Sequence, residues 1–271
     1  MTAPASSTPF ALASAVEPRG DGFVGRVPDD WTQGRGAFGG LVAAHGLRAL
    51  SARVPPERAL RSVVVDFVSP AVAGPVEIEV RLLRAGRALT HAEARIVQAR
   101  ETCAVVVAAF GASRPSTLAL APAAPPAAPP AEALARFPYL EGVTPAFTQH
   151  FDFRWASDRF PFAGASVANV GGWIRHAAPT PVDAAALLAL VDAWPAPVLP
   201  LLPARVPAST VTWMVDVAAP PPAEGFAPEA WWRFEADGIA AGDGYATVDG
   251  RMWDDRGRLV AASRQCVAVF G

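Results

Sequence analysis

The feature that most limits how this chain can fold is a proline-rich segment lying between two halves of similar pattern. Residues 119–136 read ALAPAAPPAAPPAEALAR. Proline fixes φ and lacks a backbone N–H, so we expect a semi-rigid connector here and neither helix nor strand. We therefore expect an N-terminal unit of residues 10–112, a linker of residues 113–136 and a C-terminal unit of residues 137–271.

Each half carries one helical pattern followed by strand-like runs. In the first half the helix spans Leu41–Val54, after two glycines, and Pro55 ends it. In the second half Thr180 is the expected N-cap, Pro181 takes the first helical position, and the run VDAAALLALVDAW follows. The expected strands are 62–68, 76–83, 89–98 and 103–110, then 210–217, 230–237, 244–253 and 258–270. One helix followed by an antiparallel meander predicts an α+β fold.

The late strands of the two halves share a constant offset. Gly86 and Gly242 are separated by 242 − 86 = 156 positions, and Arg95 and Arg251 by the same number. This register favours an internal duplication, with two unrelated α+β domains as the alternative. The same offset places Ala109 opposite Gln265.

Composition excludes several classes of function. The 23 basic residues are all arginine and the net charge is −2, so nucleic acid is not an expected partner. Without lysine, Schiff-base and pyridoxal-phosphate chemistry and a P-loop are impossible. The two cysteines form no disulfide framework, and the four histidines lack metal-ligand spacing, so no metal or cofactor is expected. We expect a soluble, cytoplasmic protein, since there is no signal peptide and no apolar run long enough to span a membrane.

Three segments carry a family resemblance: FGGLVAAHGLRAL (38–50), VVVDFVSPAVAGPVEIEVRLLRAGRAL (63–89) and GRMWDDRGRLVAASRQ (250–265). In order and spacing they resemble the double hot-dog acyl-CoA thioesterases of the thioesterase II-like type. The resemblance implies two tandem hot-dog units, each an antiparallel sheet around a long helix, and a homo-oligomer. It also implies hydrolysis of an acyl-CoA thioester by water that an Asp, Thr or Ser, and Gln trio activates. The matching positions are Asp192, Thr210 and Gln265.

Residue chemistry agrees best for Asp192. Its helix is apolar on all sides, so a carboxylate there is costly unless it is paired, as a general base in a dry pocket would be. The alternatives are an exposed last-turn aspartate or one that caps the following loop. Gln265 shares an otherwise apolar strand face, where its amide could hold a water molecule, or could be an ordinary core amide with satisfied hydrogen bonds.

Thr210 fits less well, because strict alternation places it on the polar face with Thr212. Ser209 or Thr212 could supply the hydroxyl instead. Before the first helix, Phe38, Gly39 and Gly40 are expected to contact substrate, with backbone N–H groups facing the thioester oxygen. The alternative for the glycines is close helix–sheet packing.

Two other functions stay open beside hydrolysis of medium or long acyl-CoAs. A hot-dog hydratase or dehydratase would need a D-x-N-P-x-H type segment, and the single asparagine, Asn169, lies in ANVGG. A catalytically silent acyl- or CoA-binding protein would need no trio. A serine hydrolase is disfavoured, since GASVA (164–168) is not a G-x-S-x-G elbow.

Overall fold

A computed structural model describes residues 7–271, and its framework is a single twelve-stranded antiparallel sheet. The strand order is β1-β2-β6-β7-β8-β5-β11-β14-β13-β12-β10-β9. The strands of the first half are β1 (Glu17–Arg19), β2 (Gly22–Val27), β5 (Ala59–Phe67), β6 (Gly74–Ala85), β7 (Leu89–Gln98) and β8 (Glu101–Gly111). Those of the second are β9 (Phe151–Trp155), β10 (Asn169–His176), β11 (Ala208–Val217), β12 (Trp232–Gly242), β13 (Tyr245–Trp253) and β14 (Leu259–Val269). A separate two-stranded ribbon joins β3 (Thr32–Gln33) to β4 (Gly36–Ala37).

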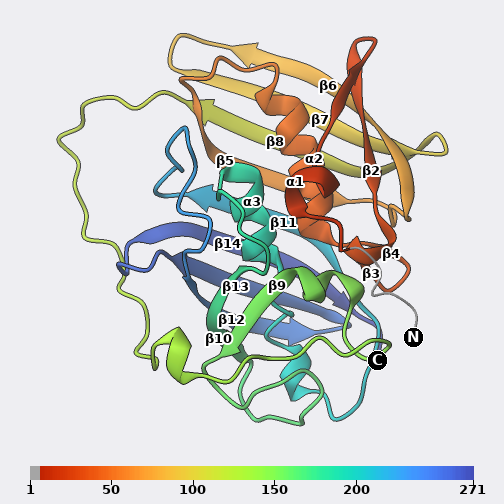
Figure 1. Ribbon diagram of the computed structural model, residues 1–271, viewed down its shortest axis with the longest axis vertical. Helices are drawn as coiled ribbons and strands as arrows, with labels where there is room; N and C mark the ends of the chain where they lie inside the picture. Colours follow the sequence, from red (N-terminus) through yellow and green to blue (C-terminus); the bar gives the residue numbers. More distant parts are fainter. Residues whose placement is uncertain (1–6) are drawn as a thin grey trace.

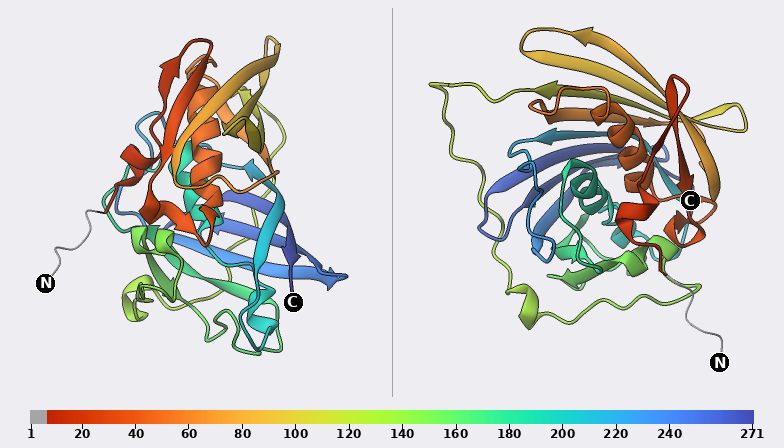
Figure 2. Two further views of the ribbon diagram at one scale, coloured as in Figure 1. Left: turned by 90° about the vertical axis from the view of Figure 1, so that its right-hand side faces the viewer. Right: turned by 45° about the horizontal axis from the view of Figure 1, so that its top comes forward.

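The sheet curves around two helices that lie side by side (Figures 1 and 2). They are α2 (Gly39–Ser51) and α3 (Ala184–Asp192), and a one-turn helix, α1 (Phe10–Ala13), precedes them. Short 3-10 turns are η1 (Asp29–Trp31), η2 (Ala131–Ala133), η3 (Ala146–His150) and η4 (Leu199–Leu201). Nearly every residue of α2 and α3 is buried in one continuous apolar core. This arrangement is the predicted α+β double hot-dog.

The two halves are related strand by strand. Counting outward from the joint between β5 and β11, each half contributes six strands in matching order. Within the first half Glu79 pairs with Arg95, and 156 positions later Glu235 pairs with Arg251. The internal duplication predicted from the offset is therefore present in the strand register.

The offset changes by one residue at the last strand. Ala92 pairs with Ala108 in the first half, and the equivalent of Ala92, Val248, pairs with Gln265 in the second. The counterpart of Gln265 is thus Ala108, and the prediction of Ala109 was wrong by one position. The extra residue lies in the connection between β13 and β14, because Val97 pairs with Thr102 whereas its equivalent, Trp253, pairs with Leu259, which is 259 − 102 = 157 positions after Thr102.

The start of α3 also differs from the prediction. The N-cap is Asp183, whose carboxylate accepts a hydrogen bond of 2.9 Å from the N–H of Ala186. The Thr180 hydroxyl instead donates to the carbonyl of Ala178, and Val182 forms a β-bridge with Phe226. Thr180 was therefore wrong as the cap, because residues 180–182 are still extended where the helix was expected to begin.

The proline-rich segment crosses the outer side of the second half and is fixed there by two indole groups. Trp253 donates to the carbonyl of Ala123 (2.8 Å), and Trp173 donates to the carbonyl of Pro129 (2.9 Å). A polyproline-like chain leaves its carbonyls free to accept such bonds. In the described part of the chain no helix is long and apolar enough to cross a membrane.

Candidate active site

The carboxyl group of Asp192 lies where the C-terminal end of α3 meets the N-terminal end of α2. A Cβ added to Gly39 would lie 2.7 Å from Oδ2 of Asp192, so the two helices approach closely only because this residue is glycine. The backbone N–H of Gly40 donates to the same carboxyl group. The first N–H groups of a helix lack intrahelical partners and carry partial positive charge, and here they face an acid.

Gln265 of β14 provides the second partner. Its Nε2 donates to Oδ1 of Asp192 at 3.0 Å. The structure therefore brings together two of the three predicted trio residues, which are 73 positions apart in the sequence. Both alternatives for Asp192, free exposure and capping of the next loop, are inconsistent with these contacts.

Burial dominates the acidity of Asp192. Loss of solvent raises the pKa of this carboxyl from 3.8 to about 7, and the hydrogen bonds from Gly40 and Gln265 oppose the rise. A carboxyl with a pKa near neutrality exchanges a proton readily at the pH of most cells, which is what general acid–base catalysis requires.

A β-bulge determines which way Thr210 faces. Thr210 pairs with Val267, but Thr212 pairs with Cys266 and Trp213 pairs with Gln265. Residues directly opposite each other in an antiparallel pair share a face, so Thr210 lies on the inner face with Gln265. The prediction that Thr210 shares the face of Thr212 was wrong, because Val211 is an extra residue between them.

The other hydroxyl candidates lie differently. Thr212 is exposed, and its strand register places it on the outer face of the sheet. Ser209 is exposed as well, and its hydroxyl donates to the carbonyl of its neighbour Thr210. Of the three hydroxyls, that of Thr210 is the one on the face of Gln265.

Phe38 lies in the core rather than on an open wall. Its side chain is fully buried and stacks on Phe147 with ring centres 4.1 Å apart. His45 on α2 is also buried and hydrogen-bonds the carbonyl of Ala13 at 2.8 Å. Of the residues expected to contact substrate, Gly39 and Gly40 are thus the ones beside the carboxyl of Asp192.

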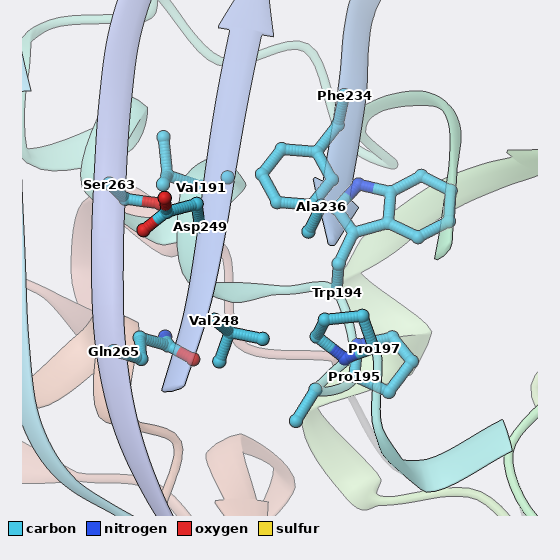
Figure 3. Close-up of a pocket in the computed structure, with 12 residues that line it drawn as sticks. Val191, Trp194, Pro195, Pro197, Phe234, Ala236, Val248, Asp249, Ser263 and Gln265 are labelled. Carbon is cyan, nitrogen blue, oxygen red and sulfur yellow. The ribbon is translucent and has the colours of Figure 1, made fainter. Parts of the chain in front are cut away.

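A small cavity adjoins Gln265 (Figure 3). Its volume is about 20 Å³, which is room for roughly one water molecule. The amide oxygen of Gln265 is turned toward Val248 and the cavity, and Trp194 forms the opposite wall. The lining residues are Val191, Trp194, Pro195, Ala196, Pro197, Phe234, Ala236, Val248, Asp249, Gly250, Ser263 and Gln265.

Two features of the site were not anticipated from the sequence. The Gly40 N–H serves the carboxylate directly, a contact that depends on how two distant helices pack. Ser263 also lines the cavity, and its position two residues from Gln265 on an alternating strand was the available signal. Within residues 7–271 no three His, Cys, Asp or Glu side chains lie close enough to hold a metal ion.

The sequence matches the acyl-CoA thioesterase N-terminal domain over residues 27–111 and the acyl-CoA thioesterase C-terminal domain over residues 119–269. A comparison with curated proteins gives no match.

Solved structures agree over nearly the full length. A protein of unknown function with a hot dog fold from Alicyclobacillus acidocaldarius is 29% identical with a TM-score of 0.86, covering 97% of this chain and 98% of its own. A proposed thioesterase II from Thermobifida fusca is 26% identical with a TM-score of 0.83, covering 98% and 99%. Acyl-CoA thioesterase II TesB2 from Mycobacterium marinum, 21% identical over 96% and 98%, has the same fold with a TM-score of 0.78.

Proposed function

The chain belongs to the acyl-CoA thioesterase family, and from this premise we propose that it hydrolyses acyl-CoA thioesters with a water molecule that Asp192 activates. The observation that carries the proposal is the partly buried Asp192 carboxyl, held by the Gly40 N–H and by the amide of Gln265. These contacts support the proposed roles of Asp192 and Gln265, and the shared inner sheet face supports that of Thr210. In its ionised form Asp192 can take a proton from water, and the Gln265 carbonyl oxygen and the Thr210 hydroxyl can orient that water.

The reaction needs no covalent enzyme intermediate. As Asp192 accepts a proton, the water oxygen forms a bond to the thioester carbonyl carbon, and the carbonyl oxygen becomes an oxyanion. The N–H of Gly39, the first residue of α2, is suited to stabilise that oxyanion. When the tetrahedral intermediate collapses, the carbon–sulfur bond breaks and the thiolate leaves with the proton that Asp192 returns. The products are a carboxylic acid and free CoA.

The walls of the cavity indicate where the acyl group lies. Val191, Trp194 and Pro197 face Phe234 and Val248 across a space of about 20 Å³ and form its apolar side, while Asp249, Ser263 and Gln265 line its polar side. An acyl chain is far larger than this volume, so we propose that substrate binding moves the Trp194–Pro197 segment away from the sheet. The length of acyl chain that the site accepts would then depend on how far the Trp194–Pro197 segment moves.

The test is thiol release from a panel of acyl-CoAs of increasing length, followed with a thiol-reactive dye. We expect turnover in the wild type and a loss of at least ~100-fold for Asp192→Asn, the usual effect of losing a general base. Binding without turnover for every acyl length would instead support a silent acyl-CoA-binding protein.

Three further assignments belong to this proposal. We place the reaction in the cytoplasm, which suits two cysteines that are both free. We assign the catalytic residues to the C-terminal unit of residues 137–271, with Gly39 and Gly40 contributed by the N-terminal unit of residues 10–112 and with residues 113–136 as the linker. We also propose a homo-oligomer, which light scattering of the purified protein would test.

A further inference from the structure

The turn between β6 and β7 differs in charge from its counterpart in the second half. The first turn carries Arg84, Arg87 and His91. By the 156-residue offset, the second turn carries Ala240, Asp243 and Thr247 at the same places. The β12–β13 hairpin forms without these basic residues, so the hairpin itself does not require them.

The three basic side chains surround a hollow. Its volume is about 220 Å³, and it is lined by Arg84, Gly86, Arg87, Ala88, Leu89 and His91, with no carboxylate among them. Arg84 and His91 are direct partners in the strand register. Cationic side chains placed opposite each other repel once both are charged, a cost that a bound anion would remove.

Two more arginines lie at the edge of this arginine hollow. The guanidinium of Arg58 donates to the Thr90 hydroxyl and to the carbonyl of Arg87. Arg61 donates to the carbonyl of Gly111, a residue whose added Cβ would lie 2.8 Å from the Leu89 side chain. Both guanidinium groups are therefore fixed in place by neutral oxygen atoms.

These arginines carry charge without counter-ions. Within the described residues, Arg58, Arg61, Arg84 and Arg87 form no ion pair, although the whole chain has a net charge of −2. Guanidinium groups match phosphate oxygens in geometry and bind them in pairs. The aliphatic surface of Ala88 and Leu89 adds an apolar wall.

We propose that the arginine hollow binds the phosphate groups of a phosphorylated nucleoside, with the apolar wall against the nucleoside portion. A volume of about 220 Å³ lies just below the range of small-ligand pockets, roughly 300 Å³ and above, so the hollow suits a ligand larger than a lone phosphate ion.

The hollow is distinct from the Asp192 site. Arg58 follows the C-terminal end of α2, whereas Asp192 lies at its N-terminal end, and 13 helical residues span about 20 Å. Figure 1 shows the β6–β7 turn at the upper edge of the molecule. Two sources share the required chemistry: the nucleotide end of the substrate's own CoA, and a separate nucleotide. The first source rests on the proposed thioesterase function, and the second does not.

The binding experiment is calorimetric titration of the full chain with adenosine 3′,5′-bisphosphate at low ionic strength. We expect the double variant Arg84→Ala/Arg87→Ala to weaken binding at least 10-fold. The matched control, Arg251→Ala/Arg256→Ala, removes two exposed arginines from the second half and is expected to leave binding unchanged. The proposal is overturned if the wild type binds no nucleotide or if both double variants weaken binding equally.

Steady-state kinetics distinguish the CoA of the substrate from a separate nucleotide as the ligand of the arginine hollow. If the hollow holds the CoA of the substrate, the Arg84/Arg87 variant raises KM for acyl-CoA about 10-fold, with kcat unchanged and with no effect on an acyl-pantetheine thioester. If a separate nucleotide binds, the Arg84/Arg87 variant binds that nucleotide more weakly in the titration, while its KM for acyl-CoA is unchanged. A protein that binds nucleotide but hydrolyses no acyl-CoA would refute the proposed function and leave the hollow's assignment standing.

Discussion

The two ends of the α2–α3 helix pair are built from opposite chemistry. At one end the Asp192 carboxyl meets the glycine start of α2. At the other end Arg48, in the last turn of α2, forms a 2.9 Å ion pair with Asp183, the N-cap of α3. Arg48 also donates to the Ser14 hydroxyl at 2.9 Å.

The Arg48–Asp183 end of the helix pair serves stability. A cation near a helix C-terminus and an anion at an N-cap are both favourable, so the Arg48–Asp183 end follows the helix dipoles. Asp192 lies at the unfavourable end of its own helix and loses solvent as well. The sheet repeats this asymmetry, since Gln265 faces Asp192 and its counterpart Ala108 can make no side-chain hydrogen bond. The costly arrangement is therefore the one to which we assign the proposed catalytic role.

We expect the greatest loss of activity from a substitution of Asp192 itself. Asp192→Asn keeps the shape of the side chain but cannot accept a proton, so kcat should fall ~100- to 10,000-fold. Asp183→Asn, the matched change at the other end, keeps an N-cap and should leave kcat within about 2-fold. Steady-state hydrolysis of one acyl-CoA by both variants is the measurement. Equal losses in the two variants would show that the ends do not differ in function.

The same substitution should stabilise the protein in a pH-dependent way. The pKa of Asp192 rises from 3.8 to about 7 on folding, so between these values the folded state holds a proton that the unfolded state has lost. The contribution of Asp192 to wild-type stability therefore falls as pH rises from 4 to 7. We expect Asp192→Asn to match the wild type near pH 4 and to exceed it by about 2–4 kcal/mol at pH 8. Urea unfolding at both pH values tests this, and a pH-independent difference would contradict it.

Removing the amide of Gln265 should alter both rate and acidity. Its hydrogen bond lowers the pKa of Asp192, so Gln265→Ala should move the acidic limb of the kcat/KM profile to higher pH. We expect kcat/KM at pH 7 to fall roughly 10- to 100-fold, since a lost charge-assisted hydrogen bond costs about 1.5–3 kcal/mol. The pH–rate profile is decisive, because a purely structural defect would lower the rate without moving the limb.

The sequence predicted the strands around this site better than it predicted the contacts between the site residues. Alternation in residues 76–83 and the offset between Arg95 and Arg251 are local patterns, and the strands follow them. The strands β2 and β10 were missed because glycines interrupt their patterns. A Cβ on Gly22 would lie 2.5 Å from the Ile78 carbonyl oxygen, and one on Gly172 would lie 2.0 Å from that of Arg154. Glycine is required there by close backbone approach, and it usually signals a loop.

The contacts of the site depend on information that one strand or helix does not contain. The side chain of Thr210 lies on the inner face because a bulge interrupts the pairing of β11 with β14. Simple alternation counted along β11 alone would place it on the outer face. The bond from Gly40 to Asp192 depends on the packing of two helices more than 130 residues apart in the chain, which no local pattern fixes. Family resemblance supplied Asp192 and Gln265, and burial then accounts for the chemistry of Asp192.

Narrowing the space at the glycine start of α2 should have a smaller effect. In Gly39→Ala the new methyl group would lie 2.7 Å from Oδ2 of Asp192, so the carboxyl must move. A displacement of this size should lower kcat about 10-fold or more while leaving the helix intact. The control is Gly242→Ala, where an added Cβ meets nothing within 4 Å. Full activity in Gly39→Ala would mean that the close approach of α2 to Asp192 is unimportant for catalysis.

A substitution of Arg48, at the opposite end of the helix pair, should have only a minor effect. The Arg48 and Asp183 side chains are 29% and 42% exposed, so solvent screens their ion pair. Arg48→Met keeps an aliphatic stem against the core and should reduce the free energy of unfolding by only about 0.5–1 kcal/mol, with kcat and the pH profile unchanged. Because solvent screening makes the pair salt-dependent, the difference from wild type should shrink in 1 M NaCl. A change in kcat for Arg48→Met would show that the Arg48–Asp183 end of the helix pair also influences the reaction. The two ends would then not differ in function as proposed.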